Sequence, residues 1–168
     1  EKHIMPENKL VPVPDGVSDE EASCITLKGI TAEYLLHRAY PLKKGDKVLY
    51  HAAAGALGQI LCPWANSIGA EIIGTVGSKE KEEIAKKNGC HHVINYTDKN
   101  FVEEVEKIVG KNGIDVVYDG VGLKTFEGSI EVLKIRGMMV AFGNASGYVD
   151  TIDVKKHINA KGLFFTRP

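Results

Sequence analysis

The stretch HAAAGALG, residues 51–58, holds glycines at a spacing that suits contact with phosphate groups. Gly55 and Gly58 match the second and third glycines of a G-x-G-x-x-G pattern, with Ala53 in place of the first. In such a turn the second glycine lets the backbone approach a pyrophosphate, and the third lets a helix pack closely on a strand. The N–H groups that begin the helix then favour an anion. The alternative interpretation is a tight strand-to-helix corner with a packing role alone.

The segment TVGSKEK, residues 75–81, indicates which dinucleotide this turn would bind. A NAD site usually has an acidic residue about 20 residues beyond the glycines, where it bonds a ribose hydroxyl. Here Gly77, Ser78, Lys79 and Lys81 occupy that part of the chain. A hydroxyl and an ammonium group suit a 2′-phosphate, whereas a carboxylate would repel it. These residues therefore predict NADP as the cofactor.

Apolar segments alternate with segments of helical periodicity along the chain. The predicted strands are residues 47–52, 71–76, 91–95, 114–120, 136–143 and 162–166. The predicted helices between them lie near residues 56–68, 79–88, 99–109 and 123–134. This alternation is typical of βαβ units. It predicts an α/β, doubly wound Rossmann fold, with a six-stranded parallel sheet of order 3-2-1-4-5-6 and helices on both faces.

Local signals mark the ends of several predicted helices. Ser18 precedes three acidic residues, which is typical of a helix N-terminus. Gly110 follows the helix predicted at 99–109 and suits a C-cap. Pro63 falls inside the helix predicted at 56–68, and we expect it to kink or shorten that helix because it lacks an N–H group.

Composition fits a soluble globular domain, with 168 residues, 43% hydrophobic and 26% charged. The net charge of -1 provides no electrostatic case for binding nucleic acid, and no apolar stretch approaches the length of a membrane span. We expect residues 1–17 to be an extended lead-in and 18–168 to form the nucleotide-binding domain. Since the chain starts without Met, we also expect a fragment.

The cysteines and histidines give no metal-binding pattern. Cys24, Cys62 and Cys90 are far apart and odd in number, which fits a reducing cytoplasm better than a disulfide framework or a metal site. His51 and His157 have no clear acidic or cysteine partner in the sequence. We therefore expect a cytoplasmic protein with no metal.

Several motifs in order resemble one family over nearly the whole chain. They are LKGITAEYLL, HAAAGALGQI, IGTVGSKEK, VINYTDKNFVEEV, VVYDGVG and GMMVAFGNASG. Together they resemble the NADPH:quinone oxidoreductases, the zeta-crystallin-like, zinc-free branch of the medium-chain dehydrogenases/reductases. Members of that family also have a GroES-like substrate domain. The resemblance implies that this chain is the nucleotide-binding domain without its substrate domain.

The resemblance also implies a cofactor site built from separate parts of the chain. Tyr34 would lie beside the cofactor, with Thr31 as a further candidate at the nicotinamide end. Gly55, Ala56 and Leu57 would contact the pyrophosphate. The 2′-phosphate would be surrounded by Gly77, Ser78, Lys81 and Tyr96. Val121 would lie near the adenine-side ribose, and the nicotinamide half would be lined by Phe142, Gly143 and Asn144. No catalytic residue is implied, because the cofactor carries the hydride chemistry.

The implied reaction is hydride transfer from NADPH to a quinone or an activated enone. The alternatives are an enoyl-thioester or alkenal reductase of the same superfamily, or a non-enzymatic nucleotide- or RNA-binding protein on this scaffold. The chain lacks the aromatic and basic stripe that single-stranded RNA requires. The resemblance further implies a two-fold homodimer joined through the edge strand at 162–166, with Phe164 and Phe165 near the seam.

Overall fold

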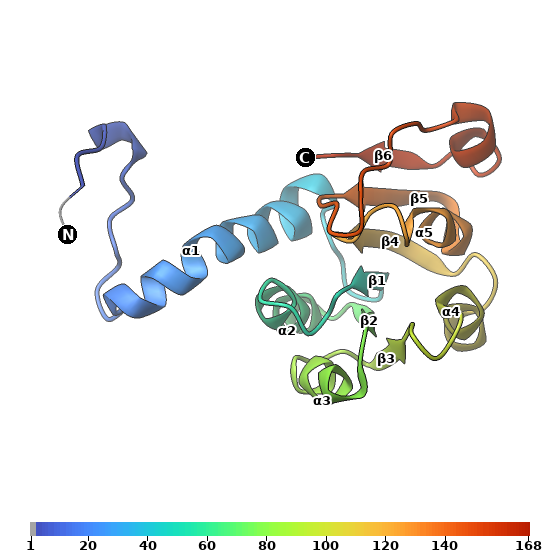
Figure 1. Cartoon of the computed structure of the whole chain (residues 1–168), viewed down its shortest axis with the longest axis horizontal. Coiled ribbons are helices and arrows are strands. Elements are labelled where there is room, and N and C mark those ends of the chain that lie inside the picture. The colour runs from blue at the N-terminus through green and yellow to red at the C-terminus, as the bar shows by residue number, and fades with distance from the viewer. Residues whose placement is uncertain (1–2) are drawn as a thin grey trace.

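The computed structural model describes residues 3–168 and shows one six-stranded sheet, drawn as arrows in Figure 1. The strand order is β3-β2-β1-β4-β5-β6 and every pair is parallel, which confirms the predicted topology. The strands are β1 (Lys47–His51), β2 (Glu71–Val76), β3 (His92–Asn95), β4 (Ile114–Asp119), β5 (Leu133–Ala141) and β6 (Phe164–Thr166).

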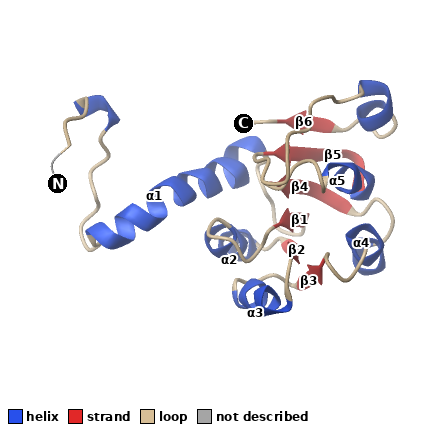
Figure 2. Cartoon of the chain, in the orientation of Figure 1, coloured by secondary structure: helices blue, strands red, loops and turns tan. Residues whose placement is uncertain are grey.

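Helices cover both faces of the sheet, as predicted (Figure 2). The end of the N-terminal helix packs with α2 and α3 on one face, and α4 and α5 pack on the other. The four crossover helices are α2 (Gly58–Ile68), α3 (Lys79–Lys87), α4 (Phe101–Val109) and α5 (Phe126–Val132). None of the helices within residues 3–168 combines the length and apolar character that a bilayer crossing requires.

The core has two halves because alternate residues of a strand face opposite sides of the sheet. Val48 and Val116 pack under α2, whereas their neighbours Leu49 and Val117 pack under α4 and α5. All four side chains are fully buried. The central strands β1 and β4 are therefore covered on both faces, as expected for a parallel sheet.

The N-terminal helix α1 (Asp19–Glu33) projects from the sheet and continues into a short π-helical segment, η2 (Tyr34–Ala39) (Figure 1). Ser18 caps α1 as predicted, through a reciprocal pair of hydrogen bonds with Glu21. Residues 3–17 contain one 3-10 turn, η1 (Glu7–Lys9). Residues 1 and 2 of the predicted lead-in lie outside the described residues, and the domain boundary after residue 17 stays a prediction.

The helix α5 is shorter than the helix predicted at 123–134, and β5 begins earlier than the predicted strand at 136–143. Apolar periodicity led us to extend the predicted helix to residue 134, but Leu133 pairs with Ile114 of β4 instead of continuing the helix. The Lys161 ammonium group donates hydrogen bonds to the carbonyls of Ile130, Glu131 and Leu133 and so caps this end of α5. A residue distant in sequence therefore decides where the helix stops.

Pro63 does not shorten its helix, because α2 runs past it to Ile68, so that part of the prediction is wrong. The kink, the other expected outcome, stays a prediction. Proline removes one backbone hydrogen bond and crowds the preceding turn. Pro63 is exposed, whereas its neighbours Leu61 and Cys62 are fully buried. Packing of that apolar face holds the helix in place until Gly69, whose φ of 93° forms the C-cap.

We expect Gly58→Ala to destabilise the chain by about 1–3 kcal/mol, the usual cost of overpacking. A Cβ atom at Gly58 would lie 2.3 Å from the carbonyl oxygen of Ala53, where α2 meets the chain leaving β1. Gly29→Ala in α1 is the matched control, because a Cβ atom there meets nothing within 4 Å. The control should raise stability slightly, through helix propensity. Urea denaturation of both variants checks this, and equal effects would contradict the close approach at Gly58.

Candidate functional site

The glycine corner lies between β1 and α2, at the carboxyl end of the central strand. Ala52 turns the chain with a φ of 62°, a left-handed conformation that is uncommon for alanine. Gly55 donates a hydrogen bond from its N–H to the Ala52 carbonyl at 2.9 Å. Ala56 and Leu57 follow, and Gly58 begins α2 in contact with the Ala53 backbone. The corner therefore has the strand–turn–helix context that a dinucleotide fingerprint needs.

A small cavity of about 120 Å³ opens beside this corner. It brings together residues from the ends of β1, β2 and β3, and four of them are predicted site residues. Its lining is Ala52, Ala54, Gly55, Val76, Gly77, Lys81 and Tyr96. No carboxylate lines it, and the Lys81 ammonium group supplies its positive charge. These features fit a phosphate group attached to a ribose.

Gly77 and Tyr96 approach each other closely in this cavity. A Cβ atom at Gly77 would lie 2.9 Å from the Tyr96 hydroxyl oxygen, so a side chain there would fill the space. Ser78 stands at the N-cap of α3 but makes no side-chain cap bond and does not line the cavity. The neighbouring Ser78 side chain lowers the pKa of the exposed Glu80 carboxylate.

A second, wider cavity of about 500 Å³ lies between α1, η2 and the end of β5. Its lining includes Thr31 and Tyr34 together with Phe142. The ring of Phe142 stacks on Tyr50 of β1, with 6.3 Å between centroids and 10° between planes. The structure thus unites predicted residues that lie far apart in the sequence. An apolar, open cavity of this kind suits the flat nicotinamide half of a dinucleotide.

The loops after β4 and β5 lie against each other. A Cβ atom at Gly143 would lie 2.5 Å from the Gly120 carbonyl oxygen, which leaves no room for a side chain. The Val121 carbonyl accepts a hydrogen bond from the Ser146 hydroxyl at 2.8 Å. Val121 and Asn144 line neither cavity, although both belong to these loops.

The carboxylate of Asp119 holds the loop after β4, and sequence reasoning missed it. Asp119 is fully buried. One carboxylate oxygen accepts hydrogen bonds from the N–H groups of Val121 at 2.7 Å and Gly122 at 2.9 Å. The other accepts from the hydroxyls of Thr125 at 2.7 Å and Ser129 at 3.2 Å. The DG pair directly after an apolar strand was the only local signal for this turn.

Sequence reasoning also missed the hydrogen-bond partners of His51, the last residue of β1. Its Nδ1 lies 2.8 Å from the Thr75 hydroxyl, and its Nε2 lies 2.9 Å from the Ser129 hydroxyl. These partners are 24 and 78 residues away, so no sequence spacing could indicate them. Burial lowers the pKa of His51, and the imidazole is therefore neutral near pH 7.

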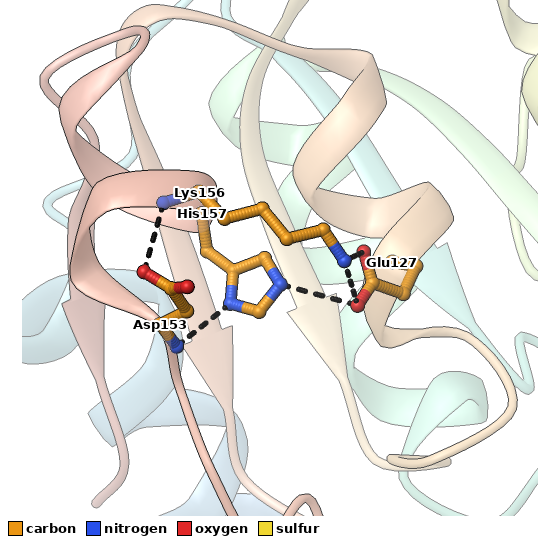
Figure 3. A network of polar contacts seen from close by, with 4 residues as sticks. All are labelled: Glu127, Asp153, Lys156 and His157. Carbon is orange, nitrogen blue, oxygen red and sulfur yellow. Dashed lines mark hydrogen bonds and ion pairs between the residues drawn. The ribbon is translucent and has the colours of Figure 1, made fainter.

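A third cavity, of about 400 Å³, contains none of the predicted site residues. Figure 3 shows the polar groups beside it. Glu127 of α5 pairs with Lys156 at 2.9 Å and with His157 Nε2 at 3.1 Å, while His157 Nδ1 accepts the Asp153 N–H at 3.1 Å. These contacts pin the segment η3 (Val154–Asn159) to α5. Because its polar groups form hydrogen bonds and ion pairs with one another, we interpret the network as having a structural role.

Metal-binding geometry is not found among residues 3–168, where no three His, Cys, Asp or Glu side chains gather around a common point. Cys24, Cys62 and Cys90 are free thiols. Cys24 is exposed and the other two are buried.

Comparison with known proteins identifies relatives over the whole chain. A 2-haloacrylate reductase from a Burkholderia species is 47% identical over 171 residues, covering 100% of this chain and 51% of its own length. Quinone oxidoreductase 1 of Escherichia coli is 43% identical over 167 residues, covering 99% of this chain and 51% of its own. This chain therefore spans about half the length of these relatives.

Solved structures agree with the fold. The crystal structure of Escherichia coli quinone oxidoreductase complexed with NADPH has a TM-score of 0.89 and 44% identity, over 94% of this chain and 48% of that one. The 2-haloacrylate reductase structure has a TM-score of 0.92 and 48% identity, over 95% and 51%. The family model described as zinc-binding dehydrogenase matches residues 56–167. The chain therefore belongs to the zinc-binding dehydrogenase family and carries its Rossmann-type domain.

Proposed function

We propose that this chain is the NADPH-binding domain of an oxidoreductase that transfers a hydride to a quinone. The observation that carries the proposal is the cavity in which Lys81 and Tyr96 face Gly55 and Gly77 with no carboxylate in the lining. NAD sites place an acidic side chain at this point, which would repel a 2′-phosphate. The similarity to a quinone oxidoreductase solved with NADPH supports the same assignment.

The remaining predicted residues divide along the length of the dinucleotide. The pyrophosphate would lie at the first turn of α2, where Ala56 and Leu57 begin the helix and its dipole favours an anion. Val121 would contact the adenine-side ribose from the loop after β4. Ser78 is at the N-cap of α3, outside the cavity lining, and would border the 2′-phosphate from there. The backbone can approach the ligand closely at Gly55, because no side chain intervenes.

The nicotinamide half would lie in the cavity lined by Thr31, Tyr34 and Phe142. Bound NADPH supplies the hydride, and the residues of this chain orient the ring and shield one of its faces. Gly143 and Asn144 continue the chain from Phe142 at the edge of this cavity. Tyr34 is 37% exposed, so its ring is available for such a contact.

The substrate of the whole protein depends on the half that this chain lacks relative to its relatives. The similarity to several quinone oxidoreductases supports a quinone. The similarity to a 2-haloacrylate reductase supports an activated alkene as the second candidate. We place the protein in the cytoplasm, since free thiols are typical of a reducing compartment.

The 168-residue chain should bind NADPH without oxidising it in the presence of quinones. The cavity beside Phe142 is open on one side, so we expect that nothing among residues 3–168 positions an acceptor against the nicotinamide. Fluorescence titration measures binding, and NADPH absorbance measures turnover. Absence of NADPH binding would overturn the proposed function. Steady quinone-dependent oxidation by the chain alone would overturn the assignment of substrate positioning to the other half.

We expect Lys81→Ala to weaken NADPH binding by about 1.5–3 kcal/mol, the range for a hydrogen bond to a charged group. NADH binding should barely change, because NADH has no 2′-phosphate for Lys81 to contact. Titration of the variant with both cofactors measures the difference.

Lys79→Ala is the matched control for this variant. Lys79 lies in the same first turn of α3 but does not line the cavity, so both affinities should stay near wild type. Equal losses of NADPH and NADH affinity in Lys81→Ala, or no loss of either, would show that Lys81 does not contact the 2′-phosphate and is an ordinary solvated side chain.

We also propose a homodimer in which two β6 strands pair. β6 is the edge of the sheet, as predicted, and Phe164 on it is 47% exposed. An exposed apolar edge is open to pairing with another strand. Sedimentation velocity at micromolar concentration should show a dimer, and Phe164→Lys should shift it to monomer. A wild-type monomer with an intact edge would contradict the pairing.

A further inference from the structure

One buried chain of hydrogen bonds joins the ends of three strands beneath the proposed cofactor site. His51 ends β1, directly before the glycine corner, and Thr75 lies opposite it in β2, two residues before Gly77. Ser129 reaches His51 from α5 and also contacts Asp119, which ends β4. Each of these four side chains is at most 1% exposed.

The partners determine where the protons lie. The Ser129 hydroxyl is 2.8 Å from the Thr125 carbonyl and 3.2 Å from the Asp119 carboxylate, and both of these groups only accept. The single Ser129 hydroxyl proton is therefore donated to these acceptors, so the Ser129 oxygen accepts a hydrogen bond from the Nε2–H of His51. Nδ1 is then unprotonated and accepts from the Thr75 hydroxyl. The assignment follows from the network and makes His51 neutral, in the Nε2–H form.

The location of this chain is what distinguishes it from ordinary core packing. Beside His51 in β1, Leu49 fills the same face of the sheet with a fully buried apolar side chain. Buried polar groups cost more than apolar ones unless every partner is present. Among residues 3–168 no buried side-chain polar atom lacks a partner. A fully satisfied network that joins three strand ends to α5 fits a role in holding the loops that follow those strands.

We propose that His51 is a positioning residue that holds the glycine corner, the β2 end and the loop after β4 in one fixed arrangement. Through Thr75 it ties the corner to the chain leading to Gly77, and through Ser129 and Asp119 it ties the corner to Val121. The phosphate-binding and ribose-binding loops then cannot shift independently. The relevance to NADPH rests on the proposed function, whereas the coupling of the loops does not.

His157 offers a matched control for His51. Both imidazoles are buried, and both use both ring nitrogens. Both also meet an aromatic ring edge-to-face, His51 with Phe101 at 5.1 Å and His157 with Phe126 at 5.2 Å. Only His51 adjoins the cofactor loops, since His157 belongs to the network of Figure 3.

His51→Phe and His157→Phe should both lower the melting temperature, because each leaves polar groups unpartnered. At a temperature where both variants are folded, only His51→Phe should raise the NADPH Kd, by about tenfold, which is the loss expected from one to two buried hydrogen bonds. His51→Gln retains a donor toward Ser129 and should recover part of this affinity. Ser129→Ala removes one hydroxyl and serves as the test if His51→Phe does not fold.

Amide hydrogen exchange without cofactor provides a second readout. His51→Phe should reduce protection of the Val121 and Gly122 amides by about tenfold, through local opening of the loop, while His157→Phe leaves them unchanged. Wild-type protection at these amides, or equal effects of both variants on NADPH binding, would overturn the positioning role. Failure of the wild-type chain to bind NADPH would overturn the proposed function alone, because the exchange result still decides the coupling.

Discussion

The hydrogen bonding of the buried Asp119 carboxylate is the interaction on which the rest of the candidate site depends. A charge removed from water is tolerated only when hydrogen bonds replace its hydration. Two backbone N–H groups and the hydroxyls of Thr125 and Ser129 provide these bonds. Satisfying the carboxylate therefore dictates the turn after β4, and Ser129 extends the same constraint to His51 and the end of β1.

Sheet topology explains why the constraint acts at this place. The order β3-β2-β1-β4-β5-β6 puts β1 beside β4, although the chain leaves them toward helices on opposite faces. Ligands of doubly wound sheets bind outside the carboxyl ends of the strands at this switch point. His51 and Asp119 are the last residues of β1 and β4, so the polar network lies directly under the crevice. Gly55 and Val121 belong to the loops that continue from them.

The proposed function divides the chemistry between this domain and the other half of a longer protein. Relatives of about twice this length carry the same domain, and the cavity beside Phe142 opens toward space that this chain does not fill. The proposed cofactor recognition depends on short-range contacts that a single Rossmann domain can provide, such as Lys81 beside Gly77. In the proposed division, substrate choice depends on a wall facing the nicotinamide that residues 3–168 do not supply.

The amino-acid sequence by itself determined the strand order, the two helical layers and the choice of Gly55, Gly77 and Lys81 for one site, because periodicity and turn residues act over short range. Tyr96, which lines the same cavity, came from the family resemblance. The resemblance added Tyr34 and Phe142, which meet at one cavity. Only the tertiary structure decided that α5 stops at Val132, that α2 continues through Pro63, and that His51 meets Thr75 and Ser129. Each of these outcomes depends on partners brought together by packing across the sheet. Buried polar groups must form hydrogen bonds, but the spacing of residues along the sequence does not indicate which groups pair.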